Sequence, residues 1–262
     1  MAEIAIKMDR VGAIRDETKI LFDVNLEFPH QQTTVVMGPS GCGKSTILKI
    51  AAGIVPPEQG DVYIDGYNIN RISDFRLNQL RKSHGFVFQD AALWANQTVT
   101  QNLSLPLQIH FNNFSREDIS RRVTETLKLC GYRDQENLKP DQLSAGERKI
   151  VSFARAIIGD PQLIFMDDPT ISVDHEGVDI LLQIIKGLKE QKRTLIVATH
   201  DPMLTSMIAD NLVVLKQGKV LASGSMAEVT RSADREVIAI LSDVLSQTST
   251  YAGDILDLLG DS

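Results

Sequence analysis

A glycine-rich run early in the chain has the residue types and spacing of a phosphate-binding loop. It fits the pattern G-x-x-x-x-G-K-[ST] at every required position. Glycines let the backbone wrap closely round an anion, so that successive N–H groups can point at phosphate oxygens. Lys44 would supply a cation for the β- and γ-phosphates, and the Ser45 hydroxyl would ligate Mg²⁺. We therefore predict a nucleoside triphosphate site formed by Gly38, Pro39, Ser40, Gly41, Cys42, Gly43, Lys44, Ser45 and Thr46.

The segments on either side of this loop are of the kinds needed to position it. Residues 33–37 form a short apolar run typical of a buried strand, and residues 47–52 begin a helical pattern. A helix directly behind the loop would add its free N-terminal donors and the positive end of its dipole. A simple glycine-rich turn is the alternative, but it does not account for a Lys-Ser pair in register behind a strand.

Two features downstream would complete such a site. Ser144 is followed by Gly146 and Glu147, and the spacing of Ser144 and Glu147 predicts a helix start with a capping box. An apolar strand over residues 162–168 ends in Asp167 and Asp168. A carboxylate at the carboxyl end of a strand, beside a phosphate loop, is where a partner for Mg²⁺ is expected.

Two further features follow in the same order. Residues 172–174, Ser-Val-Asp, lie just beyond a proline, and His200 ends the next apolar strand. Taken singly, each of the four features has an ordinary structural explanation as a helix start, a solvated turn or a polar strand end. Their shared order and spacing relative to the phosphate loop favour a single functional site.

The remaining pattern predicts an α/β fold. Strands alternate with helices beyond the phosphate loop, which indicates a mainly parallel sheet with right-handed crossovers. Alternating strands over residues 3–8 and 20–28 predict an antiparallel sheet beside this core. Residues 90–158 are mostly helical in pattern and predict a helical subdomain. A helical tail over residues 226–262 is expected to follow a domain that ends near residue 225.

Composition limits the classes of function. A net charge of −7 argues against broad electrostatic binding to nucleic acid. No apolar run approaches the roughly 20 residues needed to span a bilayer, and the amino terminus lacks a signal-peptide pattern. We therefore expect a cytoplasmic protein that reaches a membrane only through a partner. Cys42 and Cys130 are expected to be reduced thiols.

With these motifs in order, residues 3–225 resemble the nucleotide-binding domain of ATP-binding cassette (ABC) proteins. Gly38–Thr46 matches Walker A, Gln89 the Q-loop, Leu143–Glu147 the signature sequence LSGGQ, Leu163–Asp168 Walker B, Ser172–Asp174 the D-loop and His200 the switch histidine. The resemblance implies catalytic roles for Lys44, Asp168 and His200, and Mg²⁺ ligands at Ser45, Gln89 and Asp167. It also implies a head-to-tail dimer in which Ser144 and Gly146 of one subunit face the ATP of the other.

The sequence departs from the family pattern in three places. Ala145 and Glu147 replace a glycine and a glutamine of the signature, and Asp168 stands where the family has the glutamate that activates water. No aromatic residue precedes Phe22, so Val11 to Ile14 occupy the place of the residue that stacks on adenine. These departures put the strength of closure, the rate of hydrolysis and the selectivity for the base in doubt.

A second resemblance, to Mla-type lipid-transport ATPases, rests on residues 89–94, 105–107 and 234–237. It implies a peripheral subunit on the cytoplasmic face of the inner membrane, with an integral-membrane permease and a lipid-binding partner. An import cassette for a different substrate is one alternative. Another is a nucleotide-gated switch that controls a membrane partner, as in the cell-division cassette proteins.

Two apolar features have two interpretations each. Trp94 fits either the core of the helical subdomain or a groove that receives the permease. The tail carries a helical stripe at Val237, Ile240, Leu241, Val244 and Leu245, with Ile255, Leu258 and Leu259 beyond it. This stripe would pack either on its own domain or on another subunit.

Overall fold

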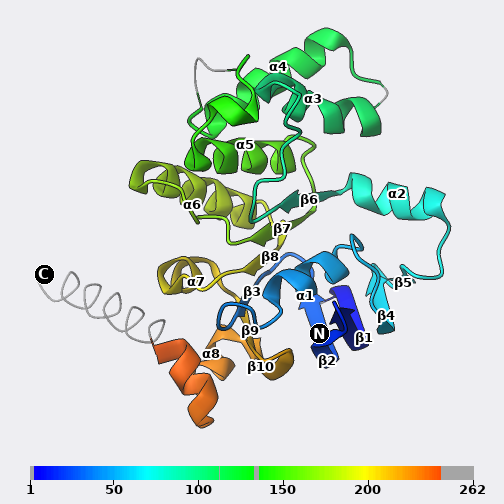
Figure 1. Ribbon diagram of the computed structural model, residues 1–262, viewed down its shortest axis with the longest axis vertical. Coiled ribbons are helices and arrows are strands. Elements are labelled where there is room, and N and C mark those ends of the chain that lie inside the picture. Colours follow the sequence, from blue (N-terminus) through cyan, green and yellow to red (C-terminus); the bar gives the residue numbers. More distant parts are fainter. Residues whose placement is uncertain (1–2, 112, 133–135, 243–262) are drawn as a thin grey trace, which may run out of the picture.

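The computed structural model describes residues 3–111, 113–132 and 136–242. Six strands form the larger sheet, in the order β10-β9-β3-β8-β7-β6 (Figure 1). Neighbouring strands are parallel except in the β9-β10 hairpin. The strands are β3 (Thr33–Met37), β6 (His84–Val87), β7 (Leu163–Asp167), β8 (Thr194–Ala198), β9 (Asn211–Lys216) and β10 (Lys219–Ser225).

A second, antiparallel sheet lies beside the first and has the order β2-β1-β4-β5. Its strands are β1 (Ile4–Arg15), β2 (Thr18–Pro29), β4 (Gln59–Ile64) and β5 (Tyr67–Asn68). The alternation read from the sequence is real in β2, where Leu21, Val24, Leu26 and Phe28 are buried. The predicted α/β class, with a mainly parallel core and an antiparallel sheet beside it, is confirmed.

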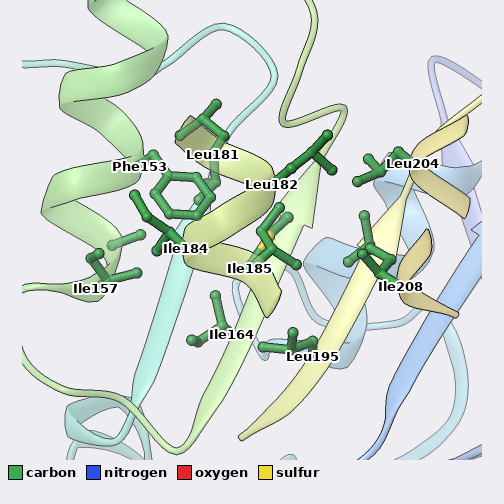
Figure 2. Packing of buried hydrophobic residues seen from close by; sticks show 14 of the residues in the cluster. Phe153, Ile157, Ile164, Leu181, Leu182, Ile184, Ile185, Leu195, Leu204 and Ile208 are labelled. Carbon is green, nitrogen blue, oxygen red and sulfur yellow. The ribbon is translucent and has the colours of Figure 1, made fainter. Parts of the chain in front are cut away.

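Each face of the larger sheet supports a separate part of the core, because adjacent residues of a strand point to opposite faces. In β7, Phe165 packs with α1 (Lys44–Ala51) and the antiparallel sheet. Its neighbour Ile164 packs with α5 (Ala145–Ile157), α6 (His175–Glu190) and α7 (Pro202–Ile208). Figure 2 shows this second layer, where Phe153 on α5 lies against the α6 side chains above Ile164 and Leu195.

Helices form the predicted subdomain at one end of the molecule (Figure 1). They are α3 (Val99–His110), α4 (Arg116–Leu129), the 3₁₀ turn η1 (Pro140–Gln142) and α5. The capping box predicted at Ser144 is present, with Glu147 as its third-position partner, and a second one begins α4 at Ser115 with Asp118. The helical subdomain is therefore confirmed as part of the fold, while its exact limits stay a prediction.

One helix escaped the sequence pattern. Helix α2 (Asp74–Lys82) has a single buried side chain, Leu80, so it has no apolar stripe to detect. Its predictable signal is local, because Ser73 caps it by accepting a hydrogen bond from the Arg76 N–H.

The tail is described only as far as residue 242. It contains α8 (Met226–Val229) and a helical segment over residues 235–242. Val237 and Leu241, each 1% exposed, pack into the larger core cluster. This part of the stripe therefore covers its own domain, whereas Val244, Leu245, Ile255, Leu258 and Leu259 lie outside the described residues. None of the described helices is long and apolar enough to cross a membrane.

Candidate functional site

The phosphate loop joins β3 to α1 and depends on its glycines. A Cβ on Gly38 would lie 2.1 Å from the carbonyl oxygen of Leu215, so no larger residue fits there. Gly43 has φ 109°, and a Cβ there would lie 2.8 Å from the Leu21 side chain. The Lys44 ammonium donates to the carbonyls of Gly38 at 2.8 Å and Pro39 at 3.1 Å. Lys44 thus bends back across its own loop, and its charge lies where the pattern places phosphate.

The metal partners predicted from separate parts of the sequence meet at the start of α1. The Ser45 hydroxyl donates to Asp167 Oδ1 at 2.9 Å. Asp167 is 2% exposed, and burial raises its pKa, as does the Asp168 charge, while the Ser45 hydrogen bond lowers it. A buried carboxylate beside a hydroxyl suits Mg²⁺, which takes oxygen ligands and whose charge would compensate the burial. These two residues therefore fit the ion that the pattern implies.

Asp168 and His200 also lie together, because β7 and β8 run parallel and end at the same edge of the sheet. Asp168 Oδ1 is 3.1 Å from His200 Nδ1. The backbone of Asp168 has φ 43°, in the left-handed region that aspartate tolerates, and its N–H donates to the carbonyl of Ala198 at 2.8 Å. Asp168 is 8% exposed whereas His200 is exposed, so the pair lies at the protein surface with the histidine on the solvent side.

The signature segment has the predicted local structure. The Ser144 N–H donates to the Glu147 carboxylate at 2.8 Å, and the Glu147 N–H donates back to the Ser144 hydroxyl at 3.2 Å. Ser144 and Ala145 are exposed, so the N-terminus of α5 faces solvent. A Cβ on Gly146 would lie 2.9 Å from the Ser172 carbonyl, which places the D-loop against this turn. Among the described residues, no hydrogen bond joins Ser144 or Gly146 to the phosphate loop of the same chain.

Gln89 lies two residues beyond β6, with an exposed side chain. Its carbonyl accepts a hydrogen bond from the Lys149 ammonium at 2.8 Å, and the carbonyl of Phe88 accepts another at 2.9 Å. No hydrogen bond of the Gln89 side chain is present among the described residues, so its role as a metal ligand stays a prediction. Lys149 was not singled out from the sequence. The sequence feature that could have identified it is its place as a single basic residue on the face of α5 that also carries the buried Phe153 and Ile157.

A groove of about 500 Å³ lies between the end of β6, α3 and α5, and Trp94 lines it. Trp94 is 46% exposed, so the interpretation of Trp94 as subdomain core is wrong. The Arg155 guanidinium lies 5.1 Å from the Trp94 ring centre and donates to the carbonyls of Ala91 and Ala92. Two more cationic side chains line the groove, those of Arg81 and Lys82, together with His84 and His110, whose pKa values are lowered by burial.

Comparison with protein-family models matches residues 21–171 to the family described as "ABC transporter". Among curated proteins, the chain is 34% identical to the intermembrane phospholipid transport system ATP-binding protein MlaF of Haemophilus influenzae. That match covers 92% of this chain and 91% of MlaF. The chain is also 32% identical to the methionine import ATP-binding protein MetN of Carboxydothermus hydrogenoformans, over 81% of this chain but 63% of MetN.

Solved structures agree with the sequence comparisons. The dimeric structure of a bacterial ABC transporter cassette superposes with a TM-score of 0.79 and 33% sequence identity, over 84% of this chain and 98% of that one. A dimeric post-hydrolysis state of the same cassette, bound to ADP and phosphate, gives the same values.

Proposed function

Because the chain belongs to the ABC transporter family, we propose that it is the ATP-hydrolysing subunit of a bacterial-type transporter and uses Mg²⁺ with ATP. The contact of Ser45 with Asp167 carries this proposal. It brings the phosphate loop and the Walker B strand together at the place that a nucleotide-bound Mg²⁺ would occupy. Lys44 would hold the β- and γ-phosphates, and the N-terminal N–H groups of α1 would face them.

The roles of Asp168 and His200 follow from their position at the edge of the sheet. Asp168 would accept a proton from the attacking water, and His200 would hold that carboxylate in place through the 3.1 Å contact. Aspartate is one methylene shorter than the family's glutamate, so its carboxylate retreats by roughly one C–C bond. Because misplacement near 1 Å can cost on the order of a hundredfold in rate, we propose slow turnover.

A second copy of this chain would complete the site. At the exposed start of α5, Ser144 and Gly146 would donate hydrogen bonds to a phosphate. That phosphate would be held by the phosphate loop of the second copy. A second helix N-terminus at the γ-phosphate would stabilise its negative charge. The related cassette of known structure is a dimer bound to ADP and phosphate, which supports a dimer, and we propose that its two copies are arranged head to tail.

The membrane partner is proposed to be a separate permease, which would hold the subunit at the cytoplasmic face of the inner membrane. The groove at Trp94 supports this, since it combines an exposed aromatic side chain with the three cationic side chains of Arg81, Lys82 and Arg155. An exposed tryptophan is a frequent anchor of protein interfaces. We place the permease there.

A lipid or another hydrophobic substrate is the transported class that we propose, with a lipid-binding protein as a further partner. The support is the match to MlaF, which spans nearly the full length of both proteins. The match to MetN supports the second candidate, an import cassette for another substrate, but it leaves more than a third of MetN uncovered.

Purification of the native complex tests the substrate and the partners together. The tagged chain would be isolated from its own membranes in mild detergent, followed by mass spectrometry of bound proteins and lipids. A permease with enriched phospholipid supports the proposal. A permease accompanied by a solute-binding protein and no enriched lipid supports the import cassette instead.

A further inference from the structure

Lys149 is a buried cation at the junction between the helical subdomain and the nucleotide site. Its side chain is 2% exposed, and both of its hydrogen bonds go to backbone carbonyls, those of Phe88 and Gln89. Burial lowers the pKa of Lys149 to about 8, while the charges of Asp167, Asp168 and Asp90 raise it. The carboxylates of the proposed metal and hydrolysis sites therefore supply part of its electrostatic compensation.

Packing alone does not explain a lysine at this position. A buried ammonium costs free energy that only good hydrogen bonds and nearby negative charge recover, and an apolar side chain of similar volume would fill the same space. The buried neighbours of Lys149 one turn further along α5 are Phe153 and the small Ser152, and neither is charged. A lysine at this position therefore lowers the stability of the fold relative to an apolar residue. What it provides is two hydrogen bonds to the Q-loop backbone.

Those contacts link two parts of the chain that would face different ATP molecules in the proposed head-to-tail dimer. Ser45 contacts Asp167 at the end of β7, and β7 pairs with β6, whose Val87 lies opposite Met166. Beyond β6, Lys149 ties the Gln89 backbone to α5. The N-terminus of the same helix, at Ser144, lies about 7.5 Å away along the helix axis at 1.5 Å per residue.

We propose that Lys149 is a positioning residue that couples the Q-loop at Gln89 to the signature helix. Through it, the exposed N-terminus of α5, which would face the ATP of the other subunit, is held in register with the phosphate loop of its own chain. The inference rests on the proposed ATPase function. Among the described residues, the Lys149 ammonium has no hydrogen bond to the phosphate loop or to Asp167, so its loss would affect the alignment of the closed site rather than the binding of nucleotide.

Kinetics of Lys149→Met test this role, because methionine fills a similar volume without charge or donors. We expect kcat for Mg-ATP to fall by at least about tenfold, as for a misplaced group, with KM and ATP affinity within about twofold of wild type. Lys149→Arg, which keeps a charged donor, should recover part of kcat. Lys189→Met is the matched control, since Lys189 also donates to a backbone carbonyl, that of Ile208, but away from the site. It should leave kcat unchanged.

Amide hydrogen exchange provides a readout that stability alone would not change. In the wild type, Mg-ATP should slow exchange both in residues 38–46 and in the first turns of α5. In Lys149→Met, Mg-ATP should slow exchange in residues 38–46 only. If the methionine variant does not fold, Lys149→Leu, which also has neither charge nor donors, takes its place with the same expectation. Wild-type kcat and wild-type protection of α5 in the variant would overturn the inference. A wild type that hydrolyses no ATP counts instead against the proposed function, and the exchange data still decide the role of Lys149.

Discussion

Asp168 Oδ1 and His200 Nδ1 lie 3.1 Å apart at the carboxyl ends of two parallel strands. This contact fixes the direction of the Asp168 carboxylate. The residue is 8% exposed, and its backbone has φ 43°. The aspartate is therefore held by the histidine rather than free to reach outward. Its shorter side chain bears directly on the rate of hydrolysis.

Substitution of Asp168 separates a misplaced base from a residue without a catalytic role. Asp168→Asn keeps the size and tolerates the left-handed backbone, but it cannot accept the proton, so we expect ATP turnover to be abolished. Asp168→Glu should raise turnover by about ten- to a hundredfold, because the carboxylate regains the missing reach. Steady-state phosphate release from purified protein measures both.

Two other outcomes have definite meanings for Asp168. A lower rate in Asp168→Glu, with Asp168→Asn still inactive, would mean that the backbone has adjusted to aspartate and that glutamate overpacks against His200. Unchanged turnover in Asp168→Asn would remove Asp168 as the base. The nucleotide-gated switch would then become the better account.

Substitution of Trp94 tests whether the groove binds the permease. Because its ring is nearly half exposed and packs on Arg155, Trp94→Ala should weaken the complex with the permease about tenfold or more while lowering the melting temperature little. Leu129→Ala, at an exposed apolar side chain that does not line the groove, is the matched control. Co-purification yield and thermal melting are the two measurements. A destabilised subunit that still binds the permease would contradict the docking role.

Deletion of residues 247–262 tests the tail, whose end lies outside the described residues. Val237 and Leu241, which pack into the core, remain in the shortened chain, so the isolated subunit should keep its melting temperature. We expect reduced assembly or reduced transport in the complex, because the partner surface then loses its contact with Ile255, Leu258 and Leu259. Unchanged assembly and unchanged transport would show that the tail end has no such contact.

Much of the fold and of the site could be predicted because the deciding interactions are local in sequence. The loop at Gly38 to Thr46 and the capping box at Ser144 follow from residue types a few positions apart. The meeting of Ser45 with Asp167 could be predicted as well, because parallel strands bring their carboxyl ends to one edge.

Features that depend on long-range packing were not predictable. Lys149 contacts residues 60 and 61 positions away, and nothing near it in sequence identifies the Phe88 and Gln89 carbonyls as its partners. Helix α2 lacked an apolar stripe because only Leu80 is buried. The exposure of Trp94 depends on how α3 and α5 flank it, so the sequence left two interpretations open.

Binding of Mg-ATP by wild type and by Lys44→Ala is the most direct test that the phosphate loop holds a nucleotide. The Lys44 ammonium lies within its own loop and is 7% exposed, so its removal should cost the phosphate charge partner and leave the fold intact. Titration with a fluorescent ATP analogue, with circular dichroism as the check on folding, should give clear binding to the wild type and at least about a hundredfold weaker binding to a folded Lys44→Ala. Near-normal affinity in the folded variant would contradict the nucleotide site.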